Sequence, residues 1–82
     1  MTWNYRIIRH IEDFKGVKYE SLSIHEVYYN DDGVPDSVSS QPVTVSCDDV
    51  EDIKGSFEFM KKAFEKDIID MQYFVNIDKK NL

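Results

Sequence analysis

The beginning of the chain alternates between apolar and polar positions, which is the pattern of a β-strand with one buried face. Between Trp3 and Ile11, aromatic and β-branched side chains recur at alternate positions. The pattern stops before Gly16, and glycine tolerates the positive φ that a tight turn requires. We therefore predict a first strand over residues 3–11 and a turn near Gly16.

A second strand is predicted over residues 18–29, but its alternation changes phase. Its first half places Leu22 and Ile24 on one face, whereas its second half places the apolar residues on the opposite face. A β-bulge near His25 would reset the phase by one residue. Alternatively, both faces of this strand are covered.

The dipeptide Asp32-Gly33 favours a hairpin turn, because both residues tolerate a positive φ. A third strand is expected over residues 34–40. It contains Pro35, which lacks the N–H group that a strand donates to its neighbour. This strand should therefore lie at an edge of the sheet.

An amphipathic helix is the most regular element that the sequence predicts. Its apolar stripe recurs at spacings of three and four residues and consists of Val50, Ile53, Phe57, Met60 and Phe64. Acidic residues lie at its beginning and lysines near its end, which complements the helix dipole. We expect the stripe to pack on the sheet, so that Phe57 is a core residue.

The end of the chain is less regular. The apolar segment 68–75 should pack back on the sheet, as a short fourth strand or a final turn, and residues 77–82 are expected to form a mobile tail. The predicted fold is a single α+β domain over residues 1–76: a three-stranded antiparallel meander, or a four-stranded version of it, with one helix packed on one face.

Charge is unevenly distributed along the chain. The formal net charge is −6, from 16 acidic and 10 basic residues, and the interval between Lys18 and Lys54 contains nine acidic residues and no basic one. An acidic surface repels phosphate and favours basic partners. We therefore expect a protein partner and no direct binding of nucleic acid.

Candidate chemistry is sparse. His10 and His25 can face each other across the first hairpin, but no third ligand is spaced to complete a metal site. Cys47 precedes the helix beside several carboxylates, which oppose the thiolate form that nucleophilic catalysis needs. We expect no catalytic residue, no metal and no cofactor.

Aromatic residues on the sheet indicate an interaction surface. One helix covers one face, so aromatic side chains on the other face either pack at the rim or contact a partner. If the hairpin turns near Gly16, residues whose numbers sum to about 32 lie opposite each other, which pairs Arg6 with Glu26 on a shared face. The candidate interaction surface consists of Trp3, Arg6, His25, Glu26 and Tyr28.

Several segments together resemble a family of short uncharacterised bacterial proteins. The likeness runs from Trp3 to about Phe74 and rests on the motifs W-N-Y-R, I-H-E-V-Y-Y, D-G and P-V, followed by the acidic-capped helix. Relatives carry proline near the end of the helix, where this chain has Asp67. The family has no assigned activity, so the resemblance carries over no functional residue.

Three functional hypotheses follow. The first is a non-enzymatic binding or regulatory module for a protein partner with a basic surface, or for a second copy of the chain. The second is a small enzyme or ligand binder whose site gathers Arg6, His25, Glu26 and a tyrosine. The third is an acidic phosphate mimic that inhibits a nucleic-acid-binding protein. Because the sequence shows neither a secretory signal nor an apolar run long enough to span a membrane, we expect a cytoplasmic location.

Overall fold

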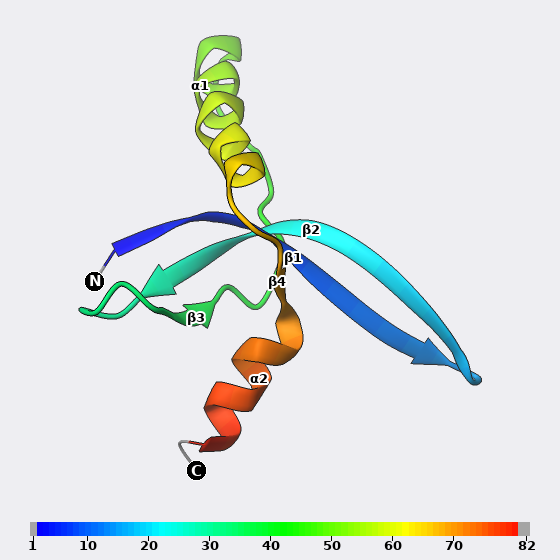
Figure 1. The fold of residues 1–82 in the computed structure, drawn as a ribbon. Helices are drawn as coiled ribbons and strands as arrows, with labels where there is room; N and C mark the ends of the chain where they lie inside the picture. Colours follow the sequence, from blue (N-terminus) through cyan, green and yellow to red (C-terminus); the bar gives the residue numbers. More distant parts are fainter. Residues whose placement is uncertain (1, 81–82) are drawn as a thin grey trace.

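A computed structural model describes residues 2–80 of the chain, with side chains up to Ile77. The described residues form a four-stranded sheet in the order β3-β2-β1-β4, together with two α-helices (Figure 1). The α+β class is confirmed, but the sheet is mixed, because β4 pairs parallel to β1. The elements are β1 (Thr2–Phe14), β2 (Val17–Tyr29), β3 (Pro35–Val38), α1 (Val50–Met60), the 3₁₀ helix η1 (Lys61–Glu65), β4 (Ile69–Asp70) and α2 (Met71–Lys80).

β1 and β2 form a long antiparallel hairpin whose register is continuous. Opposite residues have numbers that sum to 31 along its whole length. No bulge resets this pairing at His25. The second alternative holds only outside the exposed residues 11–22, because there side chains pack on both faces of the strand pair. Phe59 of α1 contacts Trp3 on one face, whereas Phe74 of α2 packs against Ile8 on the other.

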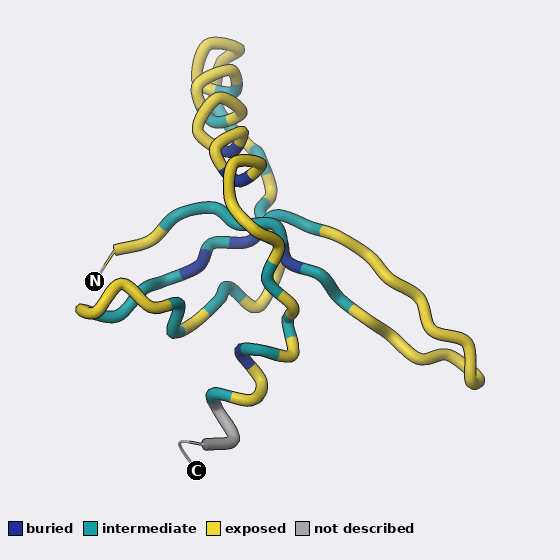
Figure 2. The backbone as a smooth tube through the Cα atoms, in the orientation of Figure 1, coloured by how far each residue is buried: buried dark blue, intermediate teal, exposed yellow. Residues whose placement is uncertain are grey.

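The end of the hairpin projects from the rest of the molecule as an arm, which comprises residues 11–22. Every residue of the arm is exposed, and Figure 2 shows it standing clear of the helices. Lys15 and Gly16 form its tip with positive φ values of 53° and 82°, as a two-residue hairpin loop requires. The backbone N–H of Gly16 donates to a carboxylate oxygen of Asp13 at 3.0 Å.

The second turn and β3 lie close to the positions that the sequence predicts for them. Gly33 has a φ of 77°, and Oδ1 of Asn30 accepts hydrogen bonds from the N–H groups of Asp32 and Val34. Pro35 begins β3, which lies at the edge of the sheet as predicted.

The core lies between the sheet and α2. It consists of Ile8, Val27 and Phe74, and partly buried apolar side chains surround it, namely Tyr29, Val38, Ile69, Met71 and Tyr73. The C-terminal apolar segment is therefore a two-residue strand followed by a helix. Residues 77–80 of the predicted tail belong to α2, and residues 81–82 lie outside the described residues.

The apolar stripe of α1 is largely uncovered. Met60 is buried and Ile53 is half-buried, but Phe57 is 53% exposed. The prediction that Phe57 is a core residue is therefore wrong. The physical reason is that η1 and the last turn of α1 reach the sheet, whereas the earlier turns stand clear of it (Figure 1).

Candidate functional site

The five residues of the predicted interaction surface are divided between the two faces of the sheet. Arg6 lies opposite His25 on the α2 side, whereas Glu26 points to the α1 side. Trp3 and Tyr28 lie opposite each other on the α1 side as well. The predicted pair of Arg6 and Glu26 is wrong, because the register differs by one residue from the predicted one and such a shift moves a side chain to the other face.

Arg6 links separate segments on the α2 side. Its Nη1 donates to the hydroxyl of Tyr29 at 2.8 Å, and its Nη2 donates to the backbone oxygen of Asp67 at 2.7 Å. The Tyr29 hydroxyl in turn donates to Oδ1 of Asn4 at 2.8 Å. Both terminal nitrogens of Arg6 are thus engaged within the protein, which makes this residue a structural tie between the hairpin and the segment before β4.

His10 and His25 face each other, an arrangement that the sequence allows, and His25 is fully buried. The Nε2 atoms of the two histidines are 3.1 Å apart, and Oγ of Ser23 lies 3.1 and 3.0 Å from them. Nδ1 of His25 lies 3.0 Å from the backbone oxygen of Ser39. Because a carbonyl oxygen only accepts, Nδ1 of His25 carries the proton, which leaves Nε2 as the acceptor facing His10 and Ser23.

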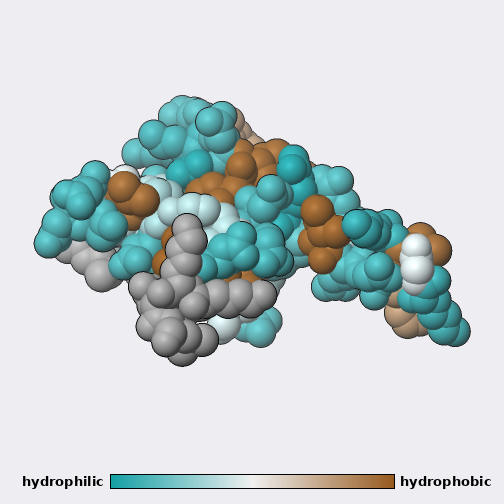
Figure 3. Space-filling view, turned by 60° about the horizontal axis from the view of Figure 1, so that its bottom comes forward, coloured by the Kyte–Doolittle hydropathy of each residue, from teal (hydrophilic) through white to brown (hydrophobic). Residues whose placement is uncertain are grey.

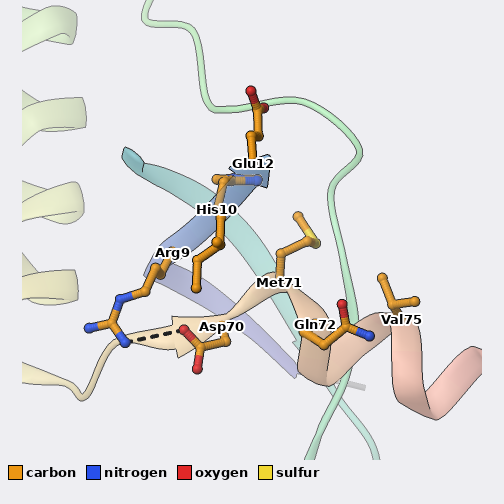
Figure 4. Close-up of a pocket in the computed structure, with 8 residues that line it drawn as sticks. Arg9, His10, Glu12, Asp70, Met71, Gln72 and Val75 are labelled. Atoms are coloured by element: carbon orange, nitrogen blue, oxygen red, sulfur yellow. Dashed lines mark hydrogen bonds and ion pairs between the residues drawn. The ribbon is translucent and has the colours of Figure 1, made fainter. Parts of the chain in front are cut away.

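The surroundings of His25 disfavour its charged form. Burial lowers the pKa of His25, the hydrogen bond to Ser39 opposes this effect, and the proximity of His10 lowers the pKa further. The cluster meets solvent at a pocket of about 380 Å³ between the end of β1 and α2, which His10 lines (Figure 4). At its rim, Nη1 of Arg9 lies 3.3 Å from Oδ1 of Asp70.

The α2 side does not assemble a metal centre of the usual composition. Within residues 2–77, no three His, Cys, Asp or Glu side chains gather in an arrangement that could hold a metal ion. The residues of the ligand-site hypothesis do not converge either, because Arg6 and His25 lie on one face and Glu26 on the other.

An aromatic cluster covers the α1 side near the beginning of β1. The ring centroids of Trp3 and Tyr5 are 5.3 Å apart, and Phe59 lies 5.7 and 5.3 Å from them, all edge to face. Such pairs attract beyond the simple burial of their area. Trp3 and Phe59 remain 44% and 42% exposed, so the cluster presents an aromatic wall to solvent.

A shallow acidic groove of about 640 Å³ runs along this wall and the first turns of α1. Tyr5 and Phe59 form its apolar side. Its remaining lining residues are Ser46, Cys47, Asp48, Glu51, Asp52, Gly55 and Ser56. These lining residues include three carboxylates and no lysine or arginine. The groove therefore gathers acidic residues from the interval between Lys18 and Lys54.

The neighbouring tyrosines are hydrogen-bond donors at neutral pH. The hydroxyl of Tyr28 donates to a carboxylate oxygen of Glu26 at 2.6 Å, and this bond raises the pKa of Tyr28. Burial raises the pKa of Tyr5, and the charge of Glu26 adds to that effect. The negative charge of Glu26 therefore extends the acidic character of the α1 side beyond the groove.

The residue pattern did not predict that the site includes Tyr5, Phe59 and the carboxylates of the groove. Phe59 lies outside the apolar stripe of α1, on the side that carries Asp52 and Ser56. A phenylalanine on the polar side of an amphipathic helix is the signal that points to this wall, because the stripe alone does not require it there.

Comparisons with known proteins do not add to this description. No protein-family model, no curated protein and no solved structure matches the chain. The resemblance to short bacterial proteins stays a prediction. In the part of the chain that the structure describes, neither helix has the length and hydropathy needed to cross a membrane.

Proposed function

We propose that the protein is a non-enzymatic binding module that takes a basic segment of a partner protein into the acidic groove. One observation carries the proposal: two aromatic rings, of Tyr5 and the exposed Phe59, line the same groove as three carboxylates. Lysine and arginine side chains are attracted both by carboxylates and by the faces of aromatic rings. A basic segment therefore matches both sides of the groove.

A contact within the chain supports this chemistry. The Nζ atom of Lys62 lies 5.4 Å from the ring centroid of Phe59. An ammonium group thus already stacks on one of the two rings that form the apolar side of the groove. The second hypothesis, a ligand site around Arg6 and Glu26, lacks comparable support, because those residues lie on opposite faces.

The proposal is tested with a fluorescent arginine-glycine peptide of about ten residues, titrated with the protein at low salt. We expect binding that weakens as the salt concentration rises, because exposed charges are screened. Glu51→Lys reverses one charge in the groove, and we expect it to weaken binding by about tenfold or more, or 1.4 kcal/mol.

The matched control is Asp32→Lys, which changes the net charge equally but lies in the exposed turn before β3. It should weaken binding by less than about threefold, because its distance from the groove leaves only a screened effect. Equal losses of affinity in the two variants would mean that the peptide responds to the net charge of the protein and does not bind in the groove. No binding of the peptide at all would refute the proposal outright.

A further inference from the structure

The chain exposes more surface than a compact monomer of its size. Its accessible surface is 6398 Å², whereas a folded monomer of 9.7 kDa is expected to expose about 5,100 Å². The radius of gyration is 14.5 Å, compared with about 12 Å for a compact domain of this length. The excess of about 1,300 Å² is larger than the roughly 800 Å² that each partner contributes to a standard interface.

Much of the uncovered apolar surface follows one edge of α1 and η1. Val50, Phe57 and Phe64 are 67%, 53% and 69% exposed and recur at intervals of seven residues. That interval places Val50 and Phe57 in a line along α1, which is the pattern of a seam that packs against another helix. Phe64 follows in η1, where the tighter 3₁₀ winding displaces it around the axis. We call the line of Val50 and Phe57 the outer edge of α1.

The outer edge is separate from the acidic groove. With 100° of rotation per residue, Phe57 lies about 160° around the helix from Phe59, which lines the groove. Because Phe59 contacts Trp3 and Tyr5 near the beginning of β1, Phe57 points away from this aromatic cluster.

The arm adds exposed apolar side chains. Leu22 lies opposite Arg9 and has the parity of Glu26 and Tyr28 in β2, which places it on the α1 side. Ile11 lies in the same arm, at the rim of the pocket beside α2. They are 54% and 61% exposed. α1 and the arm diverge from the centre of the molecule (Figure 1), and a view with the α2 end forward shows hydrophobic side chains at intervals along the arm (Figure 3).

We propose that a second copy of the chain covers these exposed side chains, in a twofold dimer in which α1 of each copy packs against α1 and the arm of the other. The patch that forms the interface consists of Leu22, Val50, Phe57 and Phe64. A twofold interface uses the same patch on both chains, so it must be self-complementary. This chain exposes apolar side chains both on α1 and on the arm, so the same patch can supply both sides of such an interface.

The dimer goes beyond the proposed function, and the two respond oppositely to salt. Two chains of net charge −6 repel each other, so screening should leave the dimer unchanged or strengthen it, whereas it weakens the binding of a basic segment. Glu51→Lys should likewise leave an apolar dimer in place. Failure of either idea therefore does not imply failure of the other.

Sedimentation velocity between about 1 and 300 µM tests the inference. The parent should show a concentration-dependent species of twice the chain mass. Phe57→Ser and Leu22→Ser should each raise the dimer dissociation constant by about tenfold or more, because central apolar contacts dominate such interfaces. Val34→Ser is the matched control: Val34 is 46% exposed, but it lies beside the turn before β3, at the other end of the hairpin from the arm. It should leave the dissociation constant unchanged.

Circular dichroism separates loss of the dimer from loss of the fold, since the substituted side chains are exposed and the variants should keep the spectrum of the parent. A parent that stays monomeric at 300 µM would overturn the inference. A dimer that both variants leave intact would overturn it too, because the contact would then use another surface.

Discussion

His25 is a titratable side chain held in a site that disfavours its charge. Its ring is fully buried, and the proton on Nδ1 is directed to the backbone oxygen of Ser39. Burial lowers the pKa of this histidine in the folded protein, while in the unfolded chain it stays near the ordinary value of about 6.5. Between these two values only the unfolded chain binds the proton, so the stability that His25 contributes is complete above about pH 6.5 and falls as the pH drops below it.

We therefore expect His25→Gln to destabilise the protein by about 1–3 kcal/mol at pH 7.5, the cost of disturbing a buried hydrogen-bonded group. The difference in the free energy of unfolding between parent and variant should become smaller at pH 5.5. Urea denaturation at both pH values measures this difference in the free energy of unfolding. Parent and variant should show the same dependence of that free energy on urea concentration, which verifies that the same transition is compared. A difference that stays constant or grows at pH 5.5 would contradict the assignment.

Arg6 provides a second prediction about a single side chain. Arg6→Ala should cost about 1.5–3 kcal/mol, because it removes hydrogen bonds from a charged donor to Tyr29 and to the backbone of Asp67. Adding Glu26→Arg to Arg6→Glu should not restore stability, since the two side chains lie on opposite faces. A double-mutant cycle measures the coupling. A coupling above about 1 kcal/mol would mean that the two side chains interact after all.

The two helices differ in what they bury. Phe74 of α2 is 4% exposed and packs on Ile8 and Val27, whereas Phe57 of α1 is 53% exposed. Phe74→Ala should therefore destabilise by about 3–5 kcal/mol, the usual cost of emptying a buried aromatic site. Phe57→Ala should cost less than about 1 kcal/mol when the protein is dilute enough to be monomeric. Urea denaturation of both variants at the same low protein concentration measures the two losses in the free energy of unfolding. Equal losses would show that α1 belongs to the core as much as α2 does.

The hairpin and its turns were the predictable elements. Alternating side chains specify the strands, and Gly16, Gly33 and Pro35 place the turns and the edge. α2 was not predictable in the same way, because the run 68–75 fits a short strand as well as a helix. Short apolar runs do not separate the two by periodicity. In the structure the run contains both, a two-residue strand and the start of α2.

The site was predictable only in part. Sequence places Trp3 and Tyr28 on one surface, and the structure keeps them together. However, a turn near Gly16 leaves the register uncertain by one residue, and the observed sum of 31 in place of 32 separates Arg6 from Glu26. The stripe of α1 likewise tells which side of the helix is apolar, but it does not tell what covers that side.

At the scale of the whole molecule, one face of the sheet is covered by a packed core and the other is only partly covered. α2 closes a core on one face of the sheet. α1 and the arm stand apart and are mostly exposed (Figures 1 and 2), and their exposed side chains include aromatic, acidic and apolar ones. Large apolar side chains that gather at an exposed surface mark an interaction site in soluble proteins. We propose that another chain completes the α1 side.

Amide hydrogen exchange at two protein concentrations tests this claim most directly. Between about 5 and 300 µM, exchange should slow in α1 and in residues 11–22, because amides covered by a second chain open less often. The amides of α2 lie on the face that carries the packed core and should exchange at the same rate at both concentrations. Rates that do not change in α1 and the arm, or that slow only in α2, would contradict the account.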